Sequence, residues 1–176
     1  MSDHAGTEAL LKTSGVPFTS LRNGFYASSA LQLMGRALET GRLVGPKDGK
    51  VSWTAHADLA DAAVIALTHE GSLTGITPRL TGSQSLDLAD IAEIGSELTG
   101  QTVTRVTVTD AEWRAGLISR GVPESRADLL VGLFAASRNG EFAVVDPTLE
   151  RLLGRPPMSF RDVLAGRLAD GSKTFF

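Results

Sequence analysis

The sequence contains no cysteine, one tyrosine and three histidines among its 176 residues. The lack of cysteine excludes disulfide bonds, thiolate metal sites and a cysteine nucleophile, which is typical of cytoplasmic proteins, and we expect a cytoplasmic location. With so few imidazoles and no thiolates, we expect no metal site. The sequence also lacks an apolar run approaching the roughly 18 residues of a membrane span, so we expect no membrane partner.

Neither sign of charge is in large excess, because 17 basic residues face 20 acidic ones and the net charge is -3. The basic residues are spread along the chain and form no basic face, so we expect no nucleic-acid partner. Hydrophobic residues make up 42% and charged residues 21% of the chain, which is typical of globular proteins. The length allows one domain with a proper core, or one and a half small lobes.

Several signature motifs are missing. No G-x-G-x-x-G follows any predicted strand, although dinucleotide binding needs such a turn so that backbone amides can approach the pyrophosphate. The segment 45–50 resembles a phosphate loop only in composition, and we interpret it as a hairpin turn. No G-x-S-x-G motif supports a serine nucleophile. Tyr26 lacks a lysine four residues later, which excludes a tyrosine and lysine proton relay.

The most informative pattern covers residues 16–26. A helical pattern ends at Gly15, an extended run follows over 16–21, and Arg22-Asn23-Gly24 interrupts it before a second helical pattern over 26–38. This order predicts a strand, a turn and a helix. The turn falls at the carboxyl end of the strand, where open α/β sheets bind ligands, so it is the first candidate for a binding site.

Further elements follow from apolar periodicity and from signals at helix ends. We expect a hairpin over 42–54, a helix over 58–69 and a strand over 77–80. After these, the patterns predict a helix over 85–100 capped by Ser85, a strand over 102–108, and helices that begin near 109, 123, 146 and 159. The chain therefore divides into an α/β region over 1–80 and a helix-rich lobe over 81–176.

His4 and Glu8 share one face of the first predicted helix because they lie four residues apart. The pair is compatible with half of a metal site or with an acid and base pair, but these residue types favour an ordinary solvated pair. His56 and His69 lie near the two ends of the helix over 58–69, and their positions alone indicate no catalytic role.

The run Leu21-Arg22-Asn23-Gly24-Phe25-Tyr26 resembles the NmrA-like branch of the atypical short-chain dehydrogenase/reductase superfamily, and within it the bacterial type 2 NAD(P)H:quinone oxidoreductases. The resemblance extends over essentially the whole chain, because six further motifs agree in order and spacing. These motifs are His4-x-x-x-Glu8 before Ser14-Gly15-Val16, Asp48-Gly49-Lys50, residues 57–63, Leu80-Thr81-Gly82, the helix over 88–100 with Val103 after it, and Gly154-Arg155-Pro156.

The resemblance implies an α/β protein that consists of the carboxyl-terminal portion of a Rossmann-like NAD(P)-binding fold and a helix-rich substrate lobe. The N-terminal βαβ units, which hold the glycine-rich fingerprint in family members, would be absent from this chain. The implied cofactor is NADP or NAD, and we do not expect tight binding by this chain alone.

The same resemblance implies roles for five residues. The backbone of Asn23, Gly24 and Phe25 would line the nicotinamide end of the cofactor, and Tyr26 would face the substrate. His4 falls where some relatives place a lysine near the nicotinamide ribose, so His4 and Tyr26 are the catalytic candidates. Quinone reductases of this type carry an asparagine shortly after the aromatic pair, and its replacement here by Ser29 weakens the case for quinone.

The implied reaction of the complete form is hydride transfer from NAD(P)H to a quinone or small carbonyl substrate, with this chain inactive alone. The alternative is a regulatory, redox-sensing or interaction module without catalysis. We expect a homo-oligomer, because a sheet without its first strands exposes an edge and an apolar face. Four apolar residues would form the substrate side, although core packing is favoured for each: Trp53, Trp113, Leu133 and Phe134.

Overall fold

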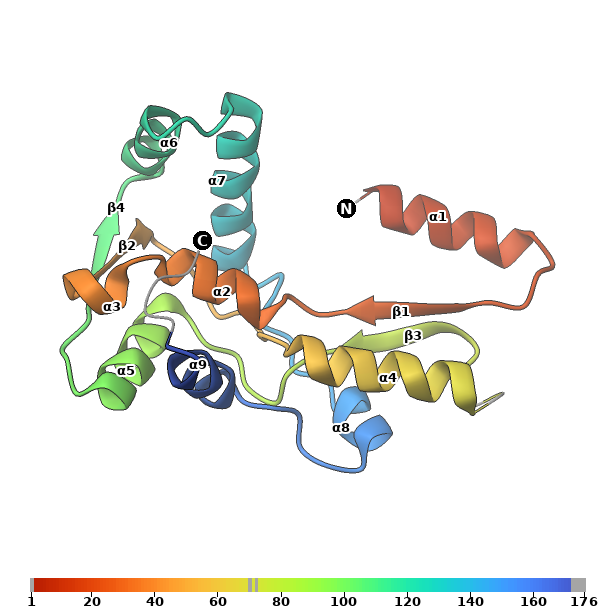
Figure 1. The fold of residues 1–176 in the computed structure, drawn as a ribbon. Coiled ribbons are helices and arrows are strands. Elements are labelled where there is room, and N and C mark those ends of the chain that lie inside the picture. Colours follow the sequence, from red (N-terminus) through yellow and green to blue (C-terminus); the bar gives the residue numbers. More distant parts are fainter. Residues whose placement is uncertain (1, 70, 72, 172–176) are drawn as a thin grey trace.

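The computed structural model describes residues 2–69, 71 and 73–171. Helices and strands alternate through most of this range, as Figure 1 shows. The elements are α1 (Ser2–Thr13), β1 (Thr19–Asn23), α2 (Ala27–Met34), α3 (Ala37–Thr40), β2 (Arg42–Pro46), α4 (His56–Thr68), β3 (Gly75–Leu80), α5 (Leu88–Thr99), β4 (Thr104–Val108), α6 (Asp110–Ser119), α7 (Glu124–Arg138), α8 (Thr148–Leu153) and α9 (Phe160–Ala169).

The strands form two parallel pairs, β1 with β3 and β2 with β4. Parallel neighbours need a crossover connection, and both crossovers here contain helices. Beside β1 and β3, α4 and α8 cover one face and α1 lies on the other side (Figure 1). The predicted α/β class is therefore confirmed.

The predicted hairpin over 42–54 is wrong. Strand β2 pairs in parallel with β4, from Arg42 beside Thr104 to Pro46 beside Val108. The expected second arm, residues 51–54, instead bridges to Leu86 through Val51 and to Tyr26 through Thr54. All four of its residues are buried, whereas a hairpin arm with one solvated face alternates between buried and exposed positions.

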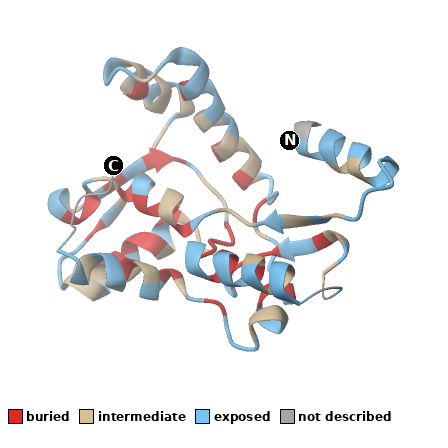
Figure 2. Ribbon diagram, turned by 45° about the vertical axis from the view of Figure 1, so that its right-hand side comes forward, coloured by how far each residue is buried: buried red, intermediate tan, exposed pale blue. Residues whose placement is uncertain are grey.

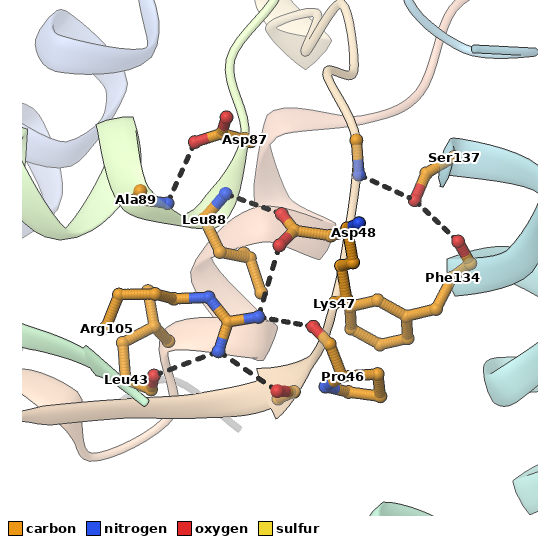
Figure 3. Close-up of polar contacts among 12 residues, drawn as sticks. Leu43, Pro46, Lys47, Asp48, Asp87, Leu88, Ala89, Arg105, Phe134 and Ser137 are labelled. Carbon is orange, nitrogen blue, oxygen red and sulfur yellow. Dashed lines mark hydrogen bonds and ion pairs between the residues drawn. The ribbon is translucent and has the colours of Figure 1, made fainter. Parts of the chain in front are cut away.

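A network around Arg105 connects β2, β4 and α5 (Figure 3). The Arg105 guanidinium donates hydrogen bonds to the main-chain carbonyls of Gly45 (3.0 Å) and Pro46, and to Asp48 Oδ1 (3.1 Å). The other carboxylate oxygen of Asp48 accepts from the Leu88 N–H at the start of α5 (2.7 Å). The segment 45–50, interpreted above as a hairpin turn, thus fixes the end of β2 to a helix.

The predicted helix caps are confirmed at two helices and wrong at a third. The capping boxes of α6 at Thr109 and of α9 at Ser159 are present. The predicted cap at Ser85 is wrong, because α5 begins at Leu88 and Asp87 accepts from the Ala89 and Asp90 N–H groups. The helix expected over 26–38 is interrupted at Gly35, whose positive φ of 49° ends α2 before α3 begins.

The larger hydrophobic core contains residues from both sides of position 80. The division into regions 1–80 and 81–176 stays a prediction. Figure 2 shows buried residues concentrated where the helices meet the strands, while α1 is mostly exposed. Trp53 and Phe134 are buried in this core, and Trp113 and Leu133 pack against it, as the core interpretation predicted. Within the described part of the chain, no helix is long and apolar enough to cross a membrane.

Candidate functional site

A cleft of about 560 Å³ lies beside the carboxyl ends of β1 and β3. Its walls come from α1, β1, the turn after β1, the end of β3 and the loop over 141–144. The volume falls in the range of small-molecule sites, and the position at the ends of parallel strands is where α/β folds bind ligands. All five predicted site residues line this cleft: His4, Asn23, Gly24, Phe25 and Tyr26.

The backbone at Gly24 passes very close to two other segments. The Gly24 N–H donates to the Leu80 carbonyl at 2.8 Å, and the Thr54 N–H donates to the Phe25 carbonyl at 2.7 Å. A Cβ atom at position 24 would lie 2.7 Å from Thr54 Oγ1 and 2.9 Å from the Leu80 carbonyl oxygen. Only glycine permits this approach, which fixes the backbone that the resemblance assigns to the nicotinamide.

Aromatic side chains form one wall of the cleft. The rings of Phe25 and Phe142 lie with centroids 4.3 Å apart, and Trp53 meets Phe25 edge to face at 6.3 Å. Ser52 holds the loop that carries Phe142, because the Ser52 N–H donates to the Phe142 carbonyl (2.9 Å) and its hydroxyl donates to the Val144 carbonyl (2.8 Å). Phe25 and Phe142 thus give this side of the cleft an apolar surface, with Trp53 packed against Phe25.

Tyr26 lies at the edge of the cleft with 40% of its surface exposed. Its ring packs against the imidazole of His56, the first residue of α4, with centroids 4.5 Å apart and an interplanar angle of 33°. The contact between these two residues could not be predicted, because thirty positions separate them in the sequence. The contact orients the only phenol of the chain beside the cleft.

Glu8 and Arg22 join α1 to β1. Arg22 donates from Nε to Glu8 Oε1 (2.8 Å) and from Nη2 to Oε2 (2.5 Å), and the Ser20 hydroxyl adds a bond of 3.2 Å to Oε1. The Arg22 hydrogen bond is the main cause that lowers the pKa of Glu8, and Glu8 in turn raises the pKa of Arg22. This bidentate pair holds α1, and with it His4, beside the cleft.

The same contacts decide between the interpretations of His4 and Glu8. A carboxylate held by Arg22 and Ser20 is neither a free base nor an available metal ligand, so Glu8 acts as an anchor. Across the described ranges, no group of three or more histidine, aspartate and glutamate side chains is arranged to hold a metal ion. His4 remains exposed on the cleft wall.

Sequence reasoning missed the wall opposite α1. Arg79 and Thr81 reach the cleft from the end of β3, and Glu141 and Phe142 reach it from the loop before α8. The motif Leu80-Thr81-Gly82 at the end of a predicted strand could have indicated Arg79 and Thr81. Nothing in the sequence indicated the loop, since its position depends on contacts with Ser52.

The fold is of the α/β class, with a cleft at the carboxyl ends of the parallel strands β1 and β3. No protein-family model matches the chain. It is 32% identical over 155 residues to quinone oxidoreductase 2 of Escherichia coli K12, covering 88% of this chain and 54% of that protein. It is 29% identical over 170 residues to an NmrA-like family domain-containing oxidoreductase of Aspergillus flavus, covering 95% and 55%.

The crystal structure of an NADPH-dependent quinone oxidoreductase from Escherichia coli in complex with NADPH superimposes with a TM-score of 0.85 and 30% identity. The match covers 96% of this chain and 59% of the other. The chain belongs to the NmrA-like family of NAD(P)H oxidoreductases of the quinone oxidoreductase 2 type. It spans about half the length of the curated relatives that it matches.

Proposed function

We propose that this chain is the carboxyl-terminal portion of an NAD(P)H-dependent oxidoreductase whose complete form reduces a quinone or another small carbonyl compound. One observation carries the proposal: five residues chosen from the sequence, on α1, at the end of β1 and on the turn after it, line a single cleft at the ends of parallel strands. NADPH is bound in the solved relative from Escherichia coli.

The described residues fit the nicotinamide end of such a cofactor. The Gly24 crossing keeps the backbone of residues 23–25 close to the cleft, and the cleft can hold a nicotinamide ring with a small substrate. The sequence contains no glycine-rich fingerprint for the pyrophosphate, so we propose that this half of the dinucleotide is bound outside the 176 residues.

The reduced nicotinamide, when bound, supplies the hydride, and the protein supplies position and environment. Phe25 and Phe142 provide an apolar surface against which a substrate ring can pack. Tyr26, at the edge of the same cleft, carries a phenol that can donate a hydrogen bond to a carbonyl oxygen as negative charge develops on it. His4 lies on the opposite wall, where its imidazole can hydrogen-bond to a ribose hydroxyl or to the substrate.

Comparing NADPH with reduced nicotinamide mononucleotide tests this proposal, because the second compound lacks the adenosine part and keeps only one phosphate of the pyrophosphate. Nicotinamide fluorescence during titration of the 176-residue chain should give similar weak affinities for the two compounds. Tight binding of NADPH alone would show that the chain holds a pyrophosphate site and would contradict the proposed division. Binding of neither compound would favour the alternative of an interaction module without catalysis.

A further inference from the structure

The register of β1 and β3 places two arginines side by side in the cleft. Thr19 and Ser20 pair with Gly75 and Ile76, but the register then shifts, so that Arg22 lies beside Arg79. Neighbours paired in a parallel sheet point to the same face, and both arginines line the cleft. Without the shift, Arg22 would lie beside Pro78.

The shift has a local cause in β3. Pro78 has no N–H group to donate to β1, and prolines inside strands occur at bulges or edges. The Arg22 N–H finds a substitute partner, because it donates to the Thr77 hydroxyl at 3.1 Å. Thr77 is buried, so this replacement is protected from water. The bulge therefore holds Arg79 on the cleft face of the strand.

The two arginines differ in what neutralises them. Glu8 forms a bidentate ion pair with Arg22. Arg79 donates only to the main-chain carbonyl of Glu141, at 3.3 Å, and no carboxylate in the described ranges lies within ion-pairing distance of it. The pKa of Asp146 is lowered mainly because Thr148 donates a hydrogen bond to its carboxylate. The positive charge of Arg79 contributes least to this lowering, so Asp146 interacts only weakly with Arg79. Within the described ranges Arg79 thus has no carboxylate in an ion pair with it, while Asp146 and Glu141 are the acidic residues near it.

The charged groups on the cleft balance in number, because Arg22 and Arg79 face Glu8 and Glu141, but Glu8 is paired with Arg22. Glu141 lines the cleft, and its carboxylate is the one negative group there, among the described residues, besides the anchored Glu8. Its main-chain carbonyl accepts from Arg79, while its side chain is exposed. A ligand anion that displaces water from Arg79 would gain charge-assisted hydrogen bonds, which are stronger than neutral ones.

We propose that Arg79 is a specificity-determining residue that selects substrates with an anionic substituent, such as a carboxylate or sulfonate, on an aromatic or quinonoid ring. This inference rests on the proposed function. The ring would lie against Phe25 and Phe142, and the anionic substituent would reach Arg79 on the neighbouring wall. The specificity would then be set by a strand bulge that is encoded by Thr77 and Pro78.

Calorimetric titration of the full chain with a neutral naphthoquinone and with the same ring bearing a sulfonate tests the inference. We expect the sulfonate to bind about tenfold more tightly, which corresponds to one charge-assisted hydrogen bond. Arg79→Gln should abolish the preference, measured as the ratio of the two affinities, whereas Arg79→Lys should keep part of it. Glu141→Gln should increase the preference, because it removes the nearby negative charge. Added salt should reduce it.

Arg36→Gln is the matched control, since Arg36 is 64% exposed on its side chain and pairs with Glu39 away from the cleft. Equal affinity for the two rings would overturn the inference and leave the proposed function intact. A sulfonate preference that survives in Arg79→Gln would overturn the assignment to Arg79. If neither ring binds, the cleft is not a quinone site, and the proposed function fails together with the inference. Thermal unfolding of each variant separates loss of binding from loss of structure.

Discussion

Gly24 is the residue at which the site is most sensitive to a single added atom. Its missing Cβ would meet Thr54 Oγ1 at 2.7 Å and a main-chain carbonyl at 2.9 Å, and the carbonyl cannot rotate away. We expect Gly24→Ala to lower the free energy of unfolding by about 1–3 kcal/mol, the usual cost of overpacking. Urea denaturation measures the change.

Gly132 in α7 is the control for this substitution. No atom lies within 4 Å of a Cβ at this position, and the residue is within a helix. Alanine should therefore stabilise the protein by about 0.5–1 kcal/mol, because glycine lowers helix stability. Unchanged stability of Gly24→Ala beside a stabilised Gly132→Ala would mean that the crossing at Gly24 has room to relax.

The stability of the folded protein should depend on pH through the single residue Glu8. Its pKa in the folded protein lies below the ordinary value of 4.5, mainly because Arg22 donates to it, so ionisation favours the folded state. This stability is present above pH 4.5 and is lost as the pH falls through the lowered pKa. In Arg22→Gln, the carboxyl carbon of Glu8 should titrate closer to 4.5 by NMR. An unchanged midpoint would show that Arg22 does not set the pKa.

Among the secondary-structure elements, β2, β4 and α5 depend on Arg105. The side chains of Arg105 and Asp48 are only 13% and 14% exposed, and Arg105 also satisfies several carbonyls at the end of β2 (Figure 3). We expect Arg105→Leu to lower the free energy of unfolding by about 3 kcal/mol, because removal of one partner leaves a buried carboxylate unpaired.

A double substitution separates the ion pair from the packing around it. Arg105→Leu with Asp48→Asn should be less destabilised than the sum of the two single variants, since the unpaired charge is gone. Arg36→Leu should change stability by about 0.5 kcal/mol or less, because its ion pair on α3 is exposed. Chemical denaturation of the unmodified protein, the two single variants and the double variant gives the coupling energy between Arg105 and Asp48. Strict additivity would contradict a coupled pair.

Elements could be predicted from sequence where their signals are local, and less well where their partners are distant. The caps at Thr109 and Ser159 involve residues three positions apart, and both were predicted. The partner of β2 lies about sixty residues away, so proximity in sequence favoured the wrong hairpin over 42–54. The break at Gly35 depends on how α2 and α3 pack against the core, which periodicity does not show.

At the scale of the whole molecule, the part of the candidate site that could be predicted is again the part whose residues lie close together in the sequence. The wall formed by α1 and the turn after β1 was predicted, because its residues belong to one continuous stretch and to the helix before it. The wall with Arg79 and Phe142 was missed, since it requires the pairing of β1 with β3 and the docking of the loop over 141–144.

The molecule also exposes apolar side chains around the β1 and β3 pair. Leu10 and Val16 are 73% and 63% exposed, and Val64 and Leu67 on α4 are 56% and 83% exposed. Together with short strand pairs that leave unpaired edges, this surface favours association. We expect a dimer or larger assembly of the 18.5 kDa chain by light scattering, and Leu67→Lys should shift it toward monomer. A monodisperse monomer for the unmodified chain would contradict this prediction.

We propose that the cleft beside β1 and β3 binds a nicotinamide and a small ring substrate. Amide NMR of the 176-residue chain during titration with reduced nicotinamide mononucleotide and a naphthoquinone tests this binding. We expect saturable shifts at Asn23, Gly24, Phe25 and Thr81, with the amides of α6 unchanged. Shifts centred on another surface, with residues 23–25 unaffected at saturation, would contradict it.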